Sequence, residues 1–143
     1  MKKSVSLILV ILLLLGCFTS CGISTLFSDA ISGDSEATPK VEEMITALAE
    51  KNIPEAKKLM HPEVADESDD DIERMSEYLD GRDAESVKAT NISINTSTGT
   101  SGKVREERIT YEVTLEDGEV ISLNVVYLSN KVGEGFYSFS IAI

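Results

Sequence analysis

The hydrophobic period of this chain changes once, near residue 84, and this change constrains the fold more than any other feature. Before it, apolar residues recur every three or four positions, as they do on one face of a helix. After it they alternate with polar residues, as they do in a strand with one buried face. Helices followed by a run of strands predict an α+β fold, with the helices packed on one face of an antiparallel sheet.

The first helix is expected to begin at Pro39, because proline suits the first helical position, with Thr38 as its cap and Asn52 at its end. Its apolar residues recur at spacings of three and four and form one stripe: Val41, Met44, Ile45, Leu48 and Ala49. This stripe is expected to be the buried face of the helix.

Two shorter helices should follow. The second is expected from Pro54 to just before Pro62, and the connection 61–67 has room for a short strand. The third is expected to open at Ser68 and to close at Gly81.

The acidic run 66–73 raises the question of a metal site. It lacks the glycine and the terminal glutamate of a calcium-binding helix–loop–helix. Carboxylates in the first turn of a helix face the positive end of its dipole, which explains Asp69, Asp70 and Asp71 without an ion. We therefore expect no metal and no cofactor.

Four strands are expected beyond the change in period, at 86–96, 104–115, 120–128 and 136–143. Short segments rich in Gly, Ser, Thr, Asp and Asn separate them. Such an order is typical of a four-stranded antiparallel meander.

The middle hairpin can be assigned a register. A two-residue turn would place Tyr111 opposite Asn124, whereas a three-residue loop, 116–118, with Gly118 in the left-handed conformation places Tyr111 opposite Leu123. Only the second register pairs apolar residues along its length, and a one-residue slip would bury polar side chains. The same register pairs Val113 with Ile121, and Ile109 with Val125.

One face of the predicted sheet is apolar and packs on the helices, and the other is polar. The apolar face is expected to carry Ile109, Tyr111, Val113, Leu115, Ile121, Leu123, Val125, Tyr127, Tyr137, Phe139 and Ile141. It holds no charge and no histidine. His61, the one histidine of the chain, is expected to be a solvated residue of the connection that follows the second helix.

The chain begins with Lys2 and Lys3, followed by an apolar run from Val5 to Leu15. A membrane-spanning helix needs about 20 apolar residues, and this run has the length of the apolar region of a signal peptide. It has no polar face, so a soluble core helix is not expected there.

The next four residues, Leu14-Leu15-Gly16-Cys17, resemble the lipobox of bacterial lipoproteins. The resemblance implies that residues 1–16 are a signal peptide, that cleavage precedes Cys17, and that its thiol carries a diacylglyceryl group and its new amino group an acyl chain. Cys21, preceded by Phe18-Thr19-Ser20, is the alternative site. Two or three acyl chains anchor a protein stably in a membrane, so the resemblance predicts a cell-membrane protein on the extracytoplasmic face.

The remaining chain divides into a tether, 17–38, rich in Ser, Gly, Thr and Asp, and one domain, 39–143. A docked helix on the domain or the membrane is the alternative for the tether, since Ile23, Leu26, Phe27 and Ile31 are apolar. Because residues 1–16 contain two lysines and no acid, the net charge falls from −12 to −14 without them. A surface this acidic repels phosphate backbones. Nucleic acid is therefore excluded as a partner.

Two segments, 47-ALAEKNIPEAKKLMHPEV-64 and 133-GEGFYSFSIAI-143, resemble the opening helices and the closing strand of the nuclear transport factor 2-like superfamily. The resemblance covers residues 38–143. It implies a cone of helices over a curved sheet, with a pocket between them. It implies no particular chemistry, because this fold hosts enzymes and binding modules.

No nucleophile or acid–base pair is indicated by spacing, so a non-catalytic role is expected, with a small hydrolase-like or isomerase-like enzyme as the alternative. The protein is expected to bind a small apolar ligand in the pocket or to dock on an envelope protein. Because the outer sheet face is polar, it is expected to be a monomer, with dimerisation through a sheet edge as the alternative. The candidate pocket residues are Tyr78, Tyr111, Tyr127, Tyr137 and Phe139. A core simply filled by these side chains remains the alternative.

Overall fold

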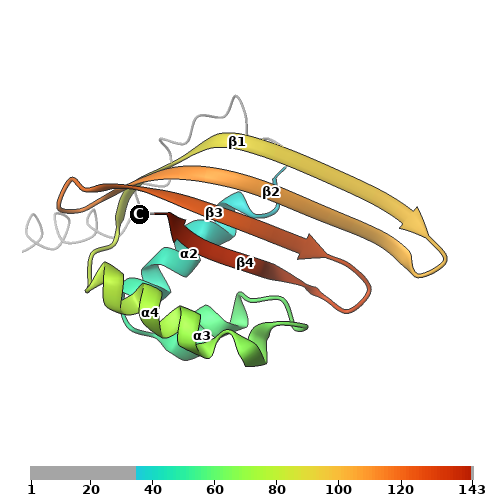
Figure 1. Cartoon of the computed structure of the whole chain (residues 1–143), viewed down its shortest axis with the longest axis horizontal. Helices are drawn as coiled ribbons and strands as arrows, with labels where there is room; N and C mark the ends of the chain where they lie inside the picture. The colour runs from blue at the N-terminus through green and yellow to red at the C-terminus, as the bar shows by residue number, and fades with distance from the viewer. Residues whose placement is uncertain (1–34, 143) are drawn as a thin grey trace, which may run out of the picture.

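The structure is a computed structural model that describes residues 35–142. The predicted signal peptide, both cysteines and most of the predicted tether lie outside the described residues. Three helices cover one face of a curved four-stranded antiparallel sheet, which confirms the α+β class (Figure 1). None of the described helices is both long and apolar enough to cross a membrane.

The helices come first in the chain, as the change in period predicts. They are α2 (Thr38–Ala49), α3 (Ile53–Lys58), a short 3-10 turn (Ala65–Glu67) and α4 (Asp69–Leu79). Asn52, predicted to end the first helix, instead caps α3, since its side chain accepts from the Glu55 backbone N–H. The helix α4 ends at Asp80, which adopts a left-handed conformation one residue before Gly81.

The start of α2 differs from its prediction. Thr38 lies inside the helix and makes no side-chain cap. Its hydroxyl lies 3.0 Å from the hydroxyl of Tyr111 instead. The Ser35 hydroxyl accepts from the Thr38 backbone N–H at 3.2 Å, and the backbone N–H groups of Glu36 and Ala37 donate to the carboxylate of Glu107 in the sheet.

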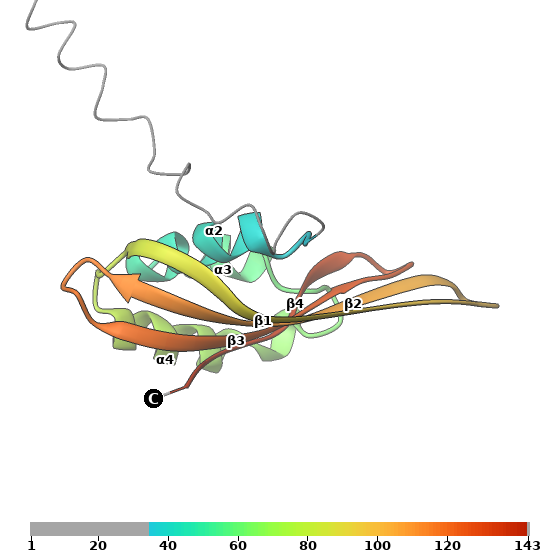
Figure 2. The ribbon, with the colours of Figure 1, turned by 90° about the horizontal axis from the view of Figure 1, so that it is seen from above.

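The strands are β1 (Ala84–Gly99), β2 (Gly102–Leu115), β3 (Val120–Ser129) and β4 (Glu134–Ala142), in the spatial order β1-β2-β3-β4. The predicted hairpin register is confirmed: Tyr111 lies opposite Leu123, and Gly118 has φ of +84°. The β1–β2 pairing continues to Gly99 and Gly102, through residues predicted to be a loop, and the resulting arm extends beyond the helices (Figure 2).

The core lies between the sheet and the helices. Its largest buried side chains include Tyr111, Phe136, Met44, Leu48, Ile72, Leu79, Leu115 and Leu123. Leu48 and Met44 belong to the apolar stripe predicted for the first helix, all of which is buried.

The last strand corrects one part of the predicted apolar face. A bulge places Phe136, not Tyr137, opposite Tyr127. Phe136 is fully buried, and Tyr137 keeps 45% of its surface exposed. The cause lies outside the strand: the backbone of Leu59 and His61 pairs with Phe136 at its outer edge, with N–O distances of 2.9 and 2.8 Å.

Candidate functional site

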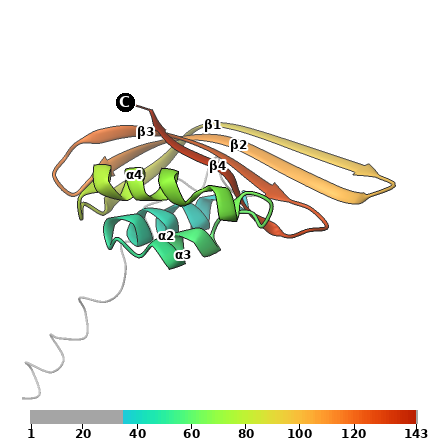
Figure 3. The same cartoon turned by 60° about the horizontal axis from the view of Figure 1, so that its bottom comes forward.

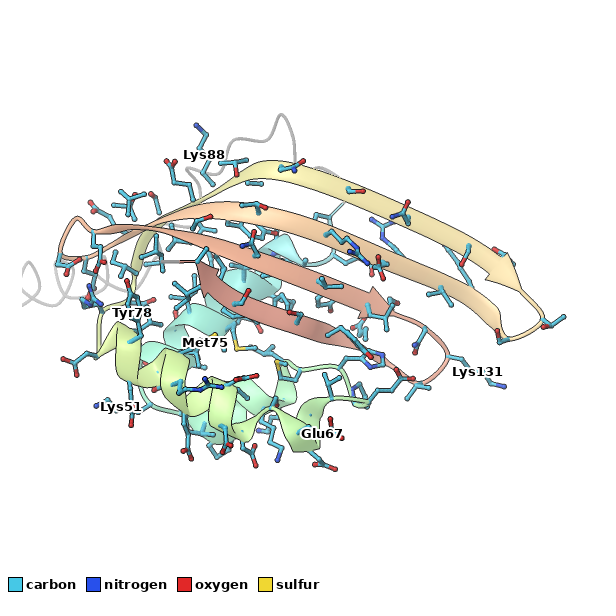
Figure 4. All side chains as sticks on the ribbon, viewed as in Figure 1. Lys51, Glu67, Met75, Tyr78, Lys88 and Lys131 are labelled. Carbon is cyan, nitrogen blue, oxygen red and sulfur yellow. The ribbon has the colours of Figure 1, made fainter. Side chains whose placement is uncertain are left out.

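A groove of about 600 Å³ separates α4 from β4 at the edge of the sheet. The helix contributes Ile72, Met75 and Tyr78, and Figure 4 shows Met75 between α4 and the sheet. The strand contributes residues 137–141. Figure 3 shows how α4 runs beside β4, and β4 is the last strand in the order β1-β2-β3-β4 that residues 35–142 form.

The wall of the groove is largely apolar, and its rim is polar. The apolar wall consists of Met60, Val64, Ile72, Met75, Tyr78, Tyr137, Phe139 and Ile141. The rim consists of Glu67, Ser68, Asp71, Arg74, Ser138 and Ser140. An apolar hollow of this size with a few polar groups at its mouth is the usual form of a ligand site.

Three of the five predicted pocket residues meet in this groove: Tyr78, Tyr137 and Phe139. Tyr111 and Tyr127 do not reach it, because they are buried in the core beneath the helices. Burial raises the pKa of each of these two phenols to about 12, so both hydroxyls stay protonated.

The tyrosine hydroxyls are less available to a ligand than predicted. Tyr78 donates to Glu119 at 3.0 Å, a bond that raises the pKa of the Tyr78 phenol. Its ring carries the Arg82 guanidinium 5.6 Å from its centroid. Tyr78 thus contributes its ring to the groove rather than its hydroxyl. The hydroxyl of Tyr137 has no hydrogen bond among residues 35–142.

Two ionisable side chains are fully buried, although the sequence predicted an apolar sheet face without charge and a solvated histidine. The first is Glu107, which accepts hydrogen bonds from the Ser35 hydroxyl (2.7 Å), from the backbone of Glu36 and Ala37 (3.0 and 3.3 Å) and from Arg105 (2.9 Å). Burial alone would raise the pKa of this carboxyl, but these donors outweigh it and hold the pKa below its usual value.

The second is His61, which was predicted to be a solvated loop residue. Its Nδ1 accepts from the Glu63 backbone N–H at 3.2 Å, so in the neutral ring the proton lies on Nε2. Nε2 lies 3.3 Å from Asn130 Oδ1 and donates a hydrogen bond to it, and the centroid of the His61 ring lies 6.1 Å from that of Tyr137. His61 therefore fastens the connection after α3 to the β3–β4 loop.

Neither buried group forms an acid–base pair with the other. Glu107 is hydrogen-bonded to the start of α2, and His61 lies at the edge of β4. The hydrogen bonds of each group hold parts of the fold together. Ser68, the buried serine at the groove, donates to the Ala65 carbonyl at 2.8 Å rather than to a base. The described residues contain no group of three or more His, Cys, Asp or Glu side chains that could hold a metal ion.

Local sequence patterns contain a signal for the groove but not for the two buried groups. Met75 and Tyr78 lie on one face of α4, and Phe139 and Ile141 alternate along β4, so periodicity places them on facing surfaces. Besides a local partner, each of these groups has a partner about 70 residues away in the chain, which is Ser35 for Glu107 and Asn130 for His61. Comparisons with known protein families, curated proteins and solved structures found no match to this chain.

Proposed function

We propose that this protein is a lipid-anchored, extracytoplasmic binding module that takes an apolar or amphipathic ligand into the groove between α4 and β4. The observation that carries the proposal is the groove itself, a largely apolar hollow of about 600 Å³ beside the hydrophobic core. The basic start, the apolar run and the sequence before Cys17 support the anchor.

A non-catalytic role is supported by the chemistry of the groove. The hydroxyls of Ser68 and Ser140 donate to backbone carbonyls rather than to a base, and the buried ionisable groups, Glu107 and His61, have structural partners elsewhere. The order of three helices and four strands also supports a nuclear transport factor 2-like cone, whose pocket would then open at the β4 edge.

The proposal is tested by fluorescence titration with a fluorescent long-chain amine. The protein used is the soluble domain, residues 35–143, made without the predicted anchor. Met75→Gln keeps the volume of the groove wall but makes it polar, so it should weaken binding by about tenfold. Val132→Gln is the matched control, because Val132 is an apolar residue that is 59% exposed in the β3–β4 loop, outside the groove. Saturable binding that the two variants affect equally would exclude the groove as the site.

A further inference from the structure

We propose that the ligand of the groove is an extended peptide of another protein, which adds to the outer edge of β4 as a further strand. The inference rests on the proposed function of the groove and names the class of its ligand. Three observations support it: the direction of the β4 backbone groups, a strand-like pairing already present on the same edge, and the charge of the rim.

The hairpin turn determines which backbone groups of β4 face the groove. Leu115 N donates to Glu119 O at 2.8 Å, and bonded and non-bonded pairs alternate along an antiparallel ladder. In the observed register Val125 therefore bonds to β2 and directs no backbone group toward β4. Its partner Phe139 must direct its N–H and C=O outward.

The same alternation applies on either side of Phe139. Ile141, opposite Leu123, directs its backbone groups outward, and so does Phe136, opposite Tyr127. The outward bonds of Phe136 to Leu59 and His61 confirm this phase. Phe139 and Ile141 thus offer a row of donors and acceptors along the groove, and no bond to this row is found among residues 35–142.

The chain itself uses the first part of this edge. Met60 forms a parallel bridge with Phe136, as an added strand would. The pairing then stops, because Glu63 N donates to the His61 ring and Val64 N to the His61 carbonyl, which turns the chain away. The remaining edge is left beside an apolar wall, an arrangement typical of peptide recognition by strand addition.

The side chains of the groove define the peptide. Residues of an added strand alternate between the helix side, where Met75 and Tyr78 provide an apolar wall, and the outer side, where Ser138 and Ser140 are exposed. The rim carries two carboxylates, Glu67 and Asp71, and one cation, Arg74, which forms an ion pair with Asp71, so the rim keeps a net charge of −1. This charge and the net charge of −12 of the chain favour a basic peptide over an acidic one. The expected ligand therefore alternates apolar residues with Lys or Arg.

The test uses a short fluorescent peptide in which Val alternates with Lys, together with two N-methylated forms, one methylated at every Val and one at every Lys. In an added strand only one of these sets directs its N–H groups toward β4. Binding should therefore fall by about tenfold or more with one methylated peptide and persist with the other. Loss at Val indicates antiparallel addition, and loss at Lys indicates parallel addition. A peptide with Glu in place of Lys should bind more weakly than the parent at low salt.

A protein variant provides a second measurement. Ile141→Pro removes an N–H that points to the groove and spares the ladder with β3, so it should weaken binding of the peptide more than Ile141→Ala does. If Ile141→Pro does not fold, the methylated peptides with the unaltered protein decide.

The outcomes separate the two proposals. Equal binding of both methylated peptides, or binding of the amine without binding of the parent peptide, overturns strand addition and leaves the groove as a site for small amphiphiles. Failure of both the amine and the peptide to bind contradicts the proposed function itself.

Discussion

The carboxylate of Glu107 holds the start of α2 against the sheet, and it does so with charge-assisted hydrogen bonds from four donors. Glu107→Gln removes the charge and replaces one of the two acceptor oxygens by an NH2 group, so two of the four donors lose their acceptor. We expect it to lower the free energy of unfolding by about 1–3 kcal/mol. Urea denaturation measures this, and Glu106→Gln, one residue away on the opposite face, should stay within about 0.5 kcal/mol of the unaltered protein.

The contribution of Glu107 should also depend on pH. Its pKa in the folded protein is lowered from 4.5, so the stabilisation is fully present above the unfolded value and is lost as the pH falls through the folded value. The difference between the unaltered protein and Glu107→Gln should therefore shrink below about pH 4. A difference that stays constant down to acidic pH would show that the charge of Glu107 plays no part.

Gly135 allows the closest backbone approach at the edge of β4. A Cβ atom at this position would lie 2.6 Å from His61 N and 2.8 Å from Leu59 O, backbone atoms that cannot move without breaking the pairing with Phe136. Gly135→Ala should destabilise the domain by about 1–3 kcal/mol. The matched control is Gly99→Ala, whose Cβ meets no atom within 4 Å and whose effect should be small. Similar melting temperatures for both variants would contradict this reading.

Among the elements, the β1–β2 arm differs from the rest of the sheet. Residues 93–99 are exposed on both faces, and the apolar side chain of Ile94 is 38% exposed. In contrast, alternate residues of 109–115 are buried under the helices. Strands without a packed face open locally at low cost. Figure 4 shows the polar side chains that extend from the arm on both sides.

We therefore expect the amides of 93–99 to exchange hydrogen at least about tenfold faster than those of 109–115, although both segments are paired in the ladder. Hydrogen exchange followed by mass spectrometry measures this on the soluble domain. If both segments are equally protected from exchange and this protection is lost when the protein is diluted, a second copy of the chain covers the arm.

Some features of the strands could be predicted from the sequence, and others could not. The β2–β3 register was predictable because the turn at Gly118 and the alternation of apolar residues both lie within the hairpin. The bulge in β4 was not, since Tyr137, Phe139 and Ile141 alternate ideally and the cause is the backbone of residues 59–61. The length of the arm was missed because its Ser, Thr and Gly residues are typical of loops.

The candidate site was also predictable only in part. Tyr78, Tyr137 and Phe139 do line one groove, because helix and strand periods place them on facing surfaces. The burial of Glu107 and His61 was not predictable, since charged or polar residues enter a core only where specific partners satisfy them. Those partners, Ser35 and Asn130, are distant in the chain and have no periodic signature.

At the scale of the whole molecule, the folded domain begins slightly earlier than the sequence indicated. Ala37 is fully buried and Ser35 bonds to Glu107, so residues 35–38 belong with the domain rather than with the tether. Ser35 thus contacts β2, whereas the groove lies at the outer edge of β4, beyond β3.

The anchor itself is tested by two substitutions. If Cys17 carries the lipid, Cys17→Ala should leave an unprocessed precursor, because cleavage requires the modified thiol, while Cys21→Ala should be processed as before. Immunoblotting of membrane and soluble fractions, with mass spectrometry of the mature amino terminus, measures both. The reverse result would assign the lipid to Cys21. Release of the unaltered protein into the soluble fraction would contradict the anchor, because two or more acyl chains hold a protein in the membrane even when its surface is as acidic as this one.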